Sequence, residues 1–277
     1  MTLLPLSETC WDLAVSLAAH HAGGHQVTAE PVERDIFQVS TISALMAGVL
    51  DGDTPYADVM RHGDFGVGTF NALDGEMAAL DGNYYHLHTD GSVTDVQPSD
   101  LTPFAAVTFF RRDAEIDIGT PYDRAGLLEL VDGTVPSTNL FYAIRVDGDF
   151  SSVTTRTAAR QSKPYPSLAE TTTSQVEHTL DSVSGTIVGF RAPQYAQGIA
   201  VAGYHLHFID DSRTVGGHVL DFTMRSGRVT LDRDADLHVE MPTSASFLDA
   251  DIDSGDSLGA AIEKAENAVH EPSDPAR

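Results

Sequence analysis

The chain has 277 residues, of which 42% are hydrophobic, so it is long enough for one large domain or two smaller ones with a buried core. The 41 acidic residues against 16 basic ones give a formal net charge of −25, which argues against nucleic acid or an anionic membrane as a partner. Cys10 is the only cysteine, so disulfides within the chain are excluded and a metal site must use histidine or carboxylate side chains.

The N-terminal stretch and the charge of the chain indicate the compartment in which the protein works. No apolar run approaches the roughly 18 residues of a membrane helix, and Glu8 and Asp12 interrupt the N-terminal stretch, which no basic residue precedes. The sequence therefore predicts a cytoplasmic protein. Lys163 and Lys264 are the only lysines. Because salt near 1 M shortens the Debye length to about 3 Å and screens repulsion between carboxylates, we expect a protein adapted to a salty cytoplasm, with an ordinary acidic enzyme as the alternative.

Helical patterns dominate the first part of the chain. Residues 1–33 show weak periodicity and are predicted to be an N-terminal extension. Residues 40–53 predict a helix, because apolar side chains recur on one face and Ser40 or Thr41 can cap it. Residues 54–63 predict a second, short helix that has a proline in its first turn.

Strands are predicted from Asp64 onward. Short apolar runs alternate with Asp-Gly pairs, a pattern typical of a β-meander, and residues 105–110 form another candidate strand. Residues 121–133 predict a helix that ends at Gly133. Residues 139–160 predict two strands joined by a turn at Asp147-Gly148.

The second half of the chain shows a similar pattern of strands separated by turns. Residues 163–170 are rich in proline and are predicted to be a linker, further strands follow, and residues 256–269 predict a helix. Two Tyr-His-Leu-His stretches, beginning at Tyr85 and Tyr204, hint at related halves. The sequence thus predicts an α+β fold with two β-sheet-based domains of mixed or antiparallel strands, flanking helices and a C-terminal helical tail. The predicted domains are residues 34–163 and 164–277, after the extension at residues 1–33.

The most informative stretch is HLHFIDDSRTVGGH, residues 205–218. Residues two apart in a strand point to the same face, so His205 and His207 would lie side by side. If Ser212-Arg213 is the centre of a turn, His218 lies opposite His207 on that face. Three neutral imidazoles with an open fourth position form the ligand set of a catalytic zinc, although imidazole also suits nickel, iron or copper.

A second His-x-His pair, His86 and His88, is a rival metal site. No third histidine follows it at hairpin distance, and a turn begins at once at Thr89. Isolated histidines on strands are usually structural, so the interpretation that these two bind a metal is the weaker one.

Longer sequence blocks resemble those of a known family. HGDFGVGTFNALDGEM (62–77), STISALMAGVLDGD, TPFAAVTFF, RTAARQSKPYPSL and GYHLHFIDDSRTVGGHVLDF are similar to segments of α-acetolactate decarboxylases and occur in the same order between about Ser40 and Pro242. The resemblance implies decarboxylation of (S)-2-acetolactate to (R)-acetoin and carbon dioxide by a protein that is usually a homodimer. It also implies zinc held by three histidines, which fall on His205, His207 and His218.

The resemblance implies three further site residues. They are Glu76 in ALDGEM, Arg156 in RTAARQ and a glutamate in the final helix, best matched by Glu266, with Glu263 one turn away. An arginine suits the substrate carboxylate through paired hydrogen bonds, and a glutamate suits delivery of a proton to one face of the product. A metal would polarise the keto and hydroxyl oxygens.

Two other functions compete with this one. A cupin-like mononuclear metal dioxygenase or isomerase also uses an HxH strand, an acidic residue and a later histidine, and Asp210 or Asp211 could supply the acid. The block at residues 62–77 would then be unexplained. A metal-binding protein without catalytic activity is the third hypothesis.

Overall fold

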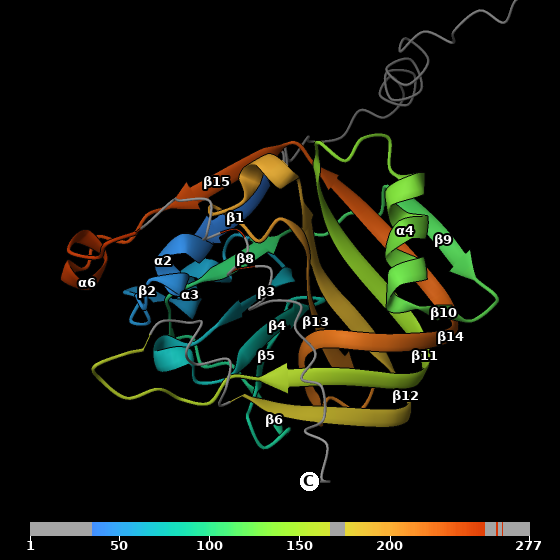
Figure 1. Ribbon diagram of the computed structural model, residues 1–277, viewed down its shortest axis with the longest axis horizontal. Helices are drawn as coiled ribbons and strands as arrows, with labels where there is room; N and C mark the ends of the chain where they lie inside the picture. Colours follow the sequence, from blue (N-terminus) through green and yellow to red (C-terminus); the bar gives the residue numbers. More distant parts are fainter. Residues whose placement is uncertain (1–34, 167–174, 253–258, 260–261, 263–277) are drawn as a thin grey trace, which may run out of the picture. The chain divides into compact units, whose positions relative to one another are not determined.

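The computed structural model describes residues 35–166 and 175–252, with Gly259 and Ile262 (Figure 1). Strands dominate, and they form two large sheets and a separate two-stranded pair. The predicted α+β class built on β-sheets with flanking helices is confirmed. The predicted C-terminal helix at residues 256–269 lies outside the described residues, apart from Gly259 and Ile262, which are helical.

The first large sheet takes most of its strands from the first half of the chain. They are β1 (Asp35–Val39), β3 (Phe65–Thr69), β4 (Glu76–Leu80), β5 (Asn83–Leu87), β6 (Val93–Asp95), β8 (Ala105–Thr108) and β15 (Asp236–Glu240). Their order is β15-β1-β8-β3-β4-β5-β6. The edge strand β15 pairs with β1 in parallel, whereas the other neighbours are antiparallel. The predicted meander is confirmed, and Asp81 and Gly82, both with positive φ (53° and 78°), form the tight turn between β4 and β5.

The second large sheet is made of longer strands. They are β9 (Ala114–Ile118), β10 (Tyr122–Asp123), β11 (Phe141–Thr157), β12 (Val176–Ala192), β13 (Gly203–Asp210) and β14 (Gly216–Asp234). The path runs β10-β14-β11-β12-β13, β9 also pairs with β14, and β13 pairs with β14 as well. Because β13 pairs with both β12 and β14, strands β11, β12, β13 and β14 form a closed ring of paired strands. The short strands β2 (Thr54–Pro55) and β7 (Leu101–Thr102) pair separately.

The predicted turn at Asp147-Gly148 is wrong, because this segment is one continuous strand of 17 residues, β11. Gly148 lies opposite Gly185 in β12 and Gly227 in β14. A Cβ atom at Gly148 would stand 2.5 Å from the backbone carbonyl oxygen of Ser226, so a larger residue does not fit without a shift of the backbone. Because these facing glycines have no side chains, the long strands can pack closely where they bend. Figure 1 shows the curvature of β11, β12 and β14. The Asp147-Gly148 pair therefore bends the strand but does not reverse the direction of the chain.

The helices differ from the predictions mainly in their ends. Helix α2 (Ile42–Met46) is capped by Thr41, whose hydroxyl accepts a hydrogen bond from the Ala44 amide at 3.2 Å. The prediction of a helix up to residue 53 is wrong, because Gly48 turns into the left-handed region with φ +85° and the chain leaves the helix there. The predicted second helix is confirmed as α3 (Tyr56–Val59).

The predicted helix at residues 121–133 is confirmed as α4 (Arg124–Thr134), with its N-cap at Asp123. It does not end at Gly133 as predicted, but continues to Thr134. In the part of the chain that the structure describes, it adds a short helix, α6 (Ala245–Leu248), and the 3₁₀ turns η1 (Asn71–Leu73) and η3 (Gln194–Ala196). None of the helices among the described residues is long and apolar enough to cross a membrane.

The two large sheets share a hydrophobic core. Buried side chains of β3 and β4, such as Phe65 and Ala78, pack in one cluster with Phe190 of β12 and Ile209 of β13. Each fully buried phenylalanine or isoleucine of this cluster contributes about 1.5–3 kcal/mol to folding. Both sheets take strands from either side of residue 163, and the division of the chain into domains at residues 33/34 and 163/164 stays a prediction.

Candidate metal centre

The hairpin of β13 and β14 is organised by one aspartate. The Asp210 carboxylate accepts hydrogen bonds from the amides of Ser212, Thr214 and Val215, at 2.7 to 3.1 Å. Burial raises the pKa of Asp210, but these backbone hydrogen bonds outweigh it and hold the pKa below its usual value. Because Arg213 takes the left-handed conformation with φ +57°, the chain reverses within five residues. Asp210 thus stabilises the turn between β13 and β14.

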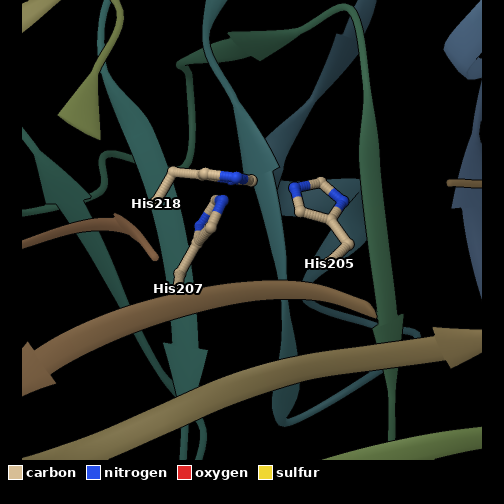
Figure 2. Close-up of side chains that lie close together, drawn as sticks. All are labelled: His205, His207 and His218. Atoms are coloured by element: carbon tan, nitrogen blue, oxygen red, sulfur yellow. The ribbon is translucent and has the colours of Figure 1, made fainter. Parts of the chain in front are cut away.

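The turn brings three histidines together as predicted. His207 of β13 pairs directly with His218 of β14, and His205 lies two residues earlier on the same face. Figure 2 shows the three imidazoles turned toward one another, and their ligand nitrogens all lie within 4.8 Å of one another. His207 and His218 are buried and His205 is half-buried, and both His205 and His218 line a pocket. This spacing suits three nitrogens around one metal ion.

His207 is prepared to act as a ligand by its hydrogen bonding. Its Nδ1 lies 2.7 Å from the carbonyl oxygen of Met77, and because a carbonyl only accepts, the proton is on Nδ1. Its Nε2 then carries no proton, so the lone pair of this nitrogen can bind a cation. That atom is buried and has no hydrogen-bond partner in the part of the chain that the structure describes. An orphaned buried nitrogen costs about 1–3 kcal/mol, which a bound cation would offset, so the residues present fit a metal ion.

The electrostatics keep His205 and His207 neutral. Burial, together with the nearby charge of Arg156, lowers the pKa of His205 to about 3. Burial also lowers the pKa of His207 well below its usual value, with His205 adding to the effect. Only neutral imidazole binds a metal, so protons do not compete strongly with a cation at neutral pH.

These shifts predict how pH affects the metal-free protein. Both pKa values are lower in the folded state than the ordinary 6.5, so between pH 6.5 and about 3 the unfolded chain binds more protons. We expect the unfolding free energy to fall as the pH is lowered through this window, by up to about 1 kcal/mol per pH unit for each histidine. Denaturant unfolding with a chelator between pH 7 and pH 5 measures this slope. A His205→Gln variant should show a shallower slope; an unchanged slope would refute the prediction.

A pocket opens beside the histidines. It has an empty volume of about 460 Å³, which includes space open to solvent. The structure brings Glu76 and Arg156 to it together with His205 and His218. Its other lining residues are Ile42, Leu45, Gly68, Thr69, Leu73, Phe104, Ala158 and Gln175.

Arg156 lies directly beside the histidine cluster. It pairs in register with His218 across β11 and β14, and with Glu177 across β11 and β12. Its side chain is 6% exposed, and its Nε atom has no hydrogen-bond partner among the described residues. A buried guanidinium at the wall of a pocket is suited to an anionic ligand.

Glu76 is the first residue of β4 and follows the η1 turn. One of its carboxylate oxygens lies 3.7 Å from Nε2 of His207, and its side chain is 14% exposed. The predicted Glu266, and its neighbour Glu263, lie outside the described residues. No pattern in the sequence marks a pocket wall or a backbone acceptor, so the places of Phe104, Gln175 and the Met77 carbonyl become visible only in the structure.

Of the rival histidines, His86 lies on β5 of the other sheet and His88 follows directly after the end of that strand. Nε2 of His86 contacts the carbonyl oxygen of Asp74, and Nε2 of His88 contacts the hydroxyl of Thr94 at 2.7 Å. Among the described residues, the group able to hold a metal ion consists of the other three histidines. His86 and His88 are engaged with protein atoms.

The fold and the site together define a class: a protein of two large β-sheets in which a hairpin places three histidines, able to hold a metal ion, beside a pocket. Residues 36–254 match the model of the family described as Alpha-acetolactate decarboxylase. The alpha-acetolactate decarboxylase of Methylococcus capsulatus is 47% identical over 247 residues, 89% of this chain and 92% of that protein. That of Methanosarcina mazei is 47% identical over 231 residues, 83% of this chain and 80% of the relative.

A solved structure agrees with these sequence matches. The crystal structure of alpha-acetolactate decarboxylase from Bacillus subtilis strain 168 superposes with a TM-score of 0.83 at 43% identity, covering 84% of this chain and all of that one. The chain belongs to the α-acetolactate decarboxylase family. The resemblance seen in the sequence is therefore confirmed, and it favours a decarboxylase over the cupin-like alternative.

Proposed function

We propose that this chain decarboxylates (S)-2-acetolactate to (R)-acetoin and carbon dioxide, with zinc held by His205, His207 and His218. The observation that carries the proposal is the convergence of three imidazoles at a pocket with a buried arginine, in a member of this family. Other divalent transition metals also suit three imidazoles. A metal bound there would act as a Lewis acid toward the keto and hydroxyl oxygens of the substrate.

Arg156 is proposed to hold the substrate carboxylate. The substrate is an anion in a strongly acidic protein, and a buried guanidinium offers it planar, charge-assisted hydrogen bonds. When the bond between the carboxylate carbon and C2 breaks, its electron pair passes toward the neighbouring carbonyl and carbon dioxide leaves. Arg156 fixes the orientation in which this bond breaks, which is a large part of what an enzyme site supplies.

One proton must then be added to carbon, from one side, to give a single enantiomer. Glu76 is a candidate for this step because its carboxylate lines the pocket and lies close to the histidine cluster. A carboxyl group within reach of the reacting carbon can act as a general acid. Glu266 is the second candidate, by resemblance alone.

The test is acetoin formation from racemic α-acetolactate, before and after removal of metal with a chelator. We expect acetoin well above the spontaneous rate, loss of activity on chelation and recovery with zinc. Acetoin only at the spontaneous rate, with every divalent metal tried and at low and high salt, would refute the proposed activity. Recovery with another metal but not with zinc would refute the choice of zinc.

We also propose that the protein is a homodimer that works in a salty cytoplasm. The charge of −25 supports the second point, because salt screens the repulsion among carboxylates that opposes folding. We expect the midpoint of thermal unfolding to rise between about 0.1 M and 1 M KCl. Sucrose, which does not screen charge, is the control. A midpoint that falls with KCl, or that sucrose raises equally, would contradict the adaptation to salt.

A further inference from the structure

We infer that His86 is a positioning residue, which holds the turn before β4 and thereby places Glu76 and the Met77 carbonyl against His207. The inference rests on the proposed function for its kinetic consequences. It gives a role to the second His-x-His pair of the sequence, which does not belong to the metal-capable cluster.

The turn before β4 is strained. Ala72 and Leu73 both adopt left-handed backbone conformations, with φ of 66° and 53°, and Gly75 follows with φ 88°. Such a conformation costs a residue with a side chain about 1–2 kcal/mol, so consecutive examples persist only where neighbouring groups hold them. The contacts of the turn therefore decide where β4 begins.

Side chains and backbone groups of neighbouring segments hold this turn, and one of them, the Arg160 guanidinium, donates to the Asp74 carboxylate at 2.6 Å. The Thr69 hydroxyl donates to the Gly75 carbonyl at 2.7 Å, and the Gly75 amide donates to the Ala158 carbonyl at 3.2 Å. His86 donates from Nε2 to the Asp74 carbonyl at 2.5 Å. A Cβ atom at Gly75 would lie 2.8 Å from the same Nε2, so the turn rests directly on the imidazole. Without His86, the Asp74 carbonyl loses its side-chain donor.

The strand that begins here controls both nitrogens of His207. The Glu76 carboxylate lies 3.7 Å from Nε2 of His207, and the next residue, Met77, accepts from its Nδ1 at 2.7 Å. Met77 is also the direct cross-strand partner of His86. A shift at the start of β4 would therefore move the carboxylate and loosen the bond that orients the imidazole.

His86 is itself held in place. Its ring stacks on Phe70 at a centroid distance of 3.7 Å and lies 3.9 Å from the ring of His88. Burial lowers the pKa of His86, so near neutral pH the ring carries one proton, which the bond to the Asp74 carbonyl places on Nε2. His88 shares the stack, but its Nε2 contacts Thr94 in the next strand and not the turn. The chain thus offers a matched control.

The experiment compares His86→Phe with His88→Phe. Phenylalanine keeps an aromatic ring for the stack at either position and removes the hydrogen-bonding nitrogens, and the larger size of its ring is common to both variants. For His86→Phe we expect kcat to fall by about 10- to 100-fold, as for other residues that orient a metal ligand, while KM changes by less than about twofold. For His88→Phe we expect both constants to stay at the wild-type values. His86→Gln, whose amide can still donate, should recover most of the lost kcat.

A second readout does not depend on activity. In the metal-free protein the Nδ1–H proton of His207, bonded to the Met77 carbonyl, should give a low-field proton resonance. We expect this resonance to shift or broaden in His86→Phe and to stay unchanged in His88→Phe. A wild-type kcat and resonance in a folded His86→Phe protein, or equal losses in both variants, would overturn the inference. If the wild-type protein itself forms no acetoin, the proposed function fails, and the resonance alone decides the role of His86.

Discussion

Replacing His207 by alanine is expected to remove zinc and to lower kcat/KM for acetoin formation by at least about 10³-fold. A metal Lewis acid contributes several kcal/mol to the stabilisation of developing negative charge, and each 1.4 kcal/mol is a factor of ten in rate. His207 is fully buried between the other two imidazoles, so no solvent-exposed side chain can replace it as a ligand. Zinc content by elemental analysis and steady-state kinetics measure the two effects.

The control for this variant is His88→Ala, which alters the second histidine of the other His-x-His pair. We expect it to retain zinc and to keep kcat/KM within about threefold of the wild-type value, because His88 bonds to Thr94 and does not approach the cluster. If His88→Ala lost the metal and His207→Ala kept it, the proposed site would be wrong and the rival pair would take its place.

Arg156→Lys is expected to lower kcat/KM by about 10²-fold while zinc stays bound. The guanidinium of Arg156 is buried beside His218, and lysine keeps its charge but loses the planar array of donors that fits a carboxylate. Loss of one preorganised charged donor typically costs about 10²- to 10³-fold. The measurement is the dependence of initial rate on acetolactate concentration, together with zinc content.

Arg228→Lys is the matched control for this variant. Arg228 lies on β14 like His218, but it is 45% exposed and pairs with the surface residue Asp117. Exposed ion pairs contribute little to stability, so we expect wild-type kinetics. An Arg156→Lys protein that matched Arg228→Lys in kcat/KM would show that Arg156 does not hold the substrate.

The histidine hairpin could be predicted from the sequence because every determinant is local. Alternation along β13 places His205 and His207 on one face, and the turn centred at Ser212-Arg213 fixes the register that pairs His207 with His218. The predicted meander succeeded for the same reason, since its Asp-Gly turns join strands that are neighbours in sequence.

Features that depend on distant segments could not be predicted. An Asp-Gly pair at Gly148 predicts a turn by itself, but the glycines opposite it on β12 and β14 turn it into a bend within one strand. The Met77 carbonyl that orients His207 belongs to a residue 130 positions away in the other sheet, and a backbone acceptor leaves no trace in residue identity. Packing between the sheets therefore supplies what local patterns lack.

The double pairing of β14 limits how this sequence can change during evolution. At His218 the strand pairs with Arg156 of β11 on one side and with His207 of β13 on the other. Three site residues therefore lie in register across three neighbouring strands. Loops on a surface commonly accept insertions and deletions. The loop at residues 211–215 is largely exposed, yet adding or removing one residue would turn His218 to the opposite face of the sheet. The number of residues in this loop is as much a part of the site as the histidines themselves.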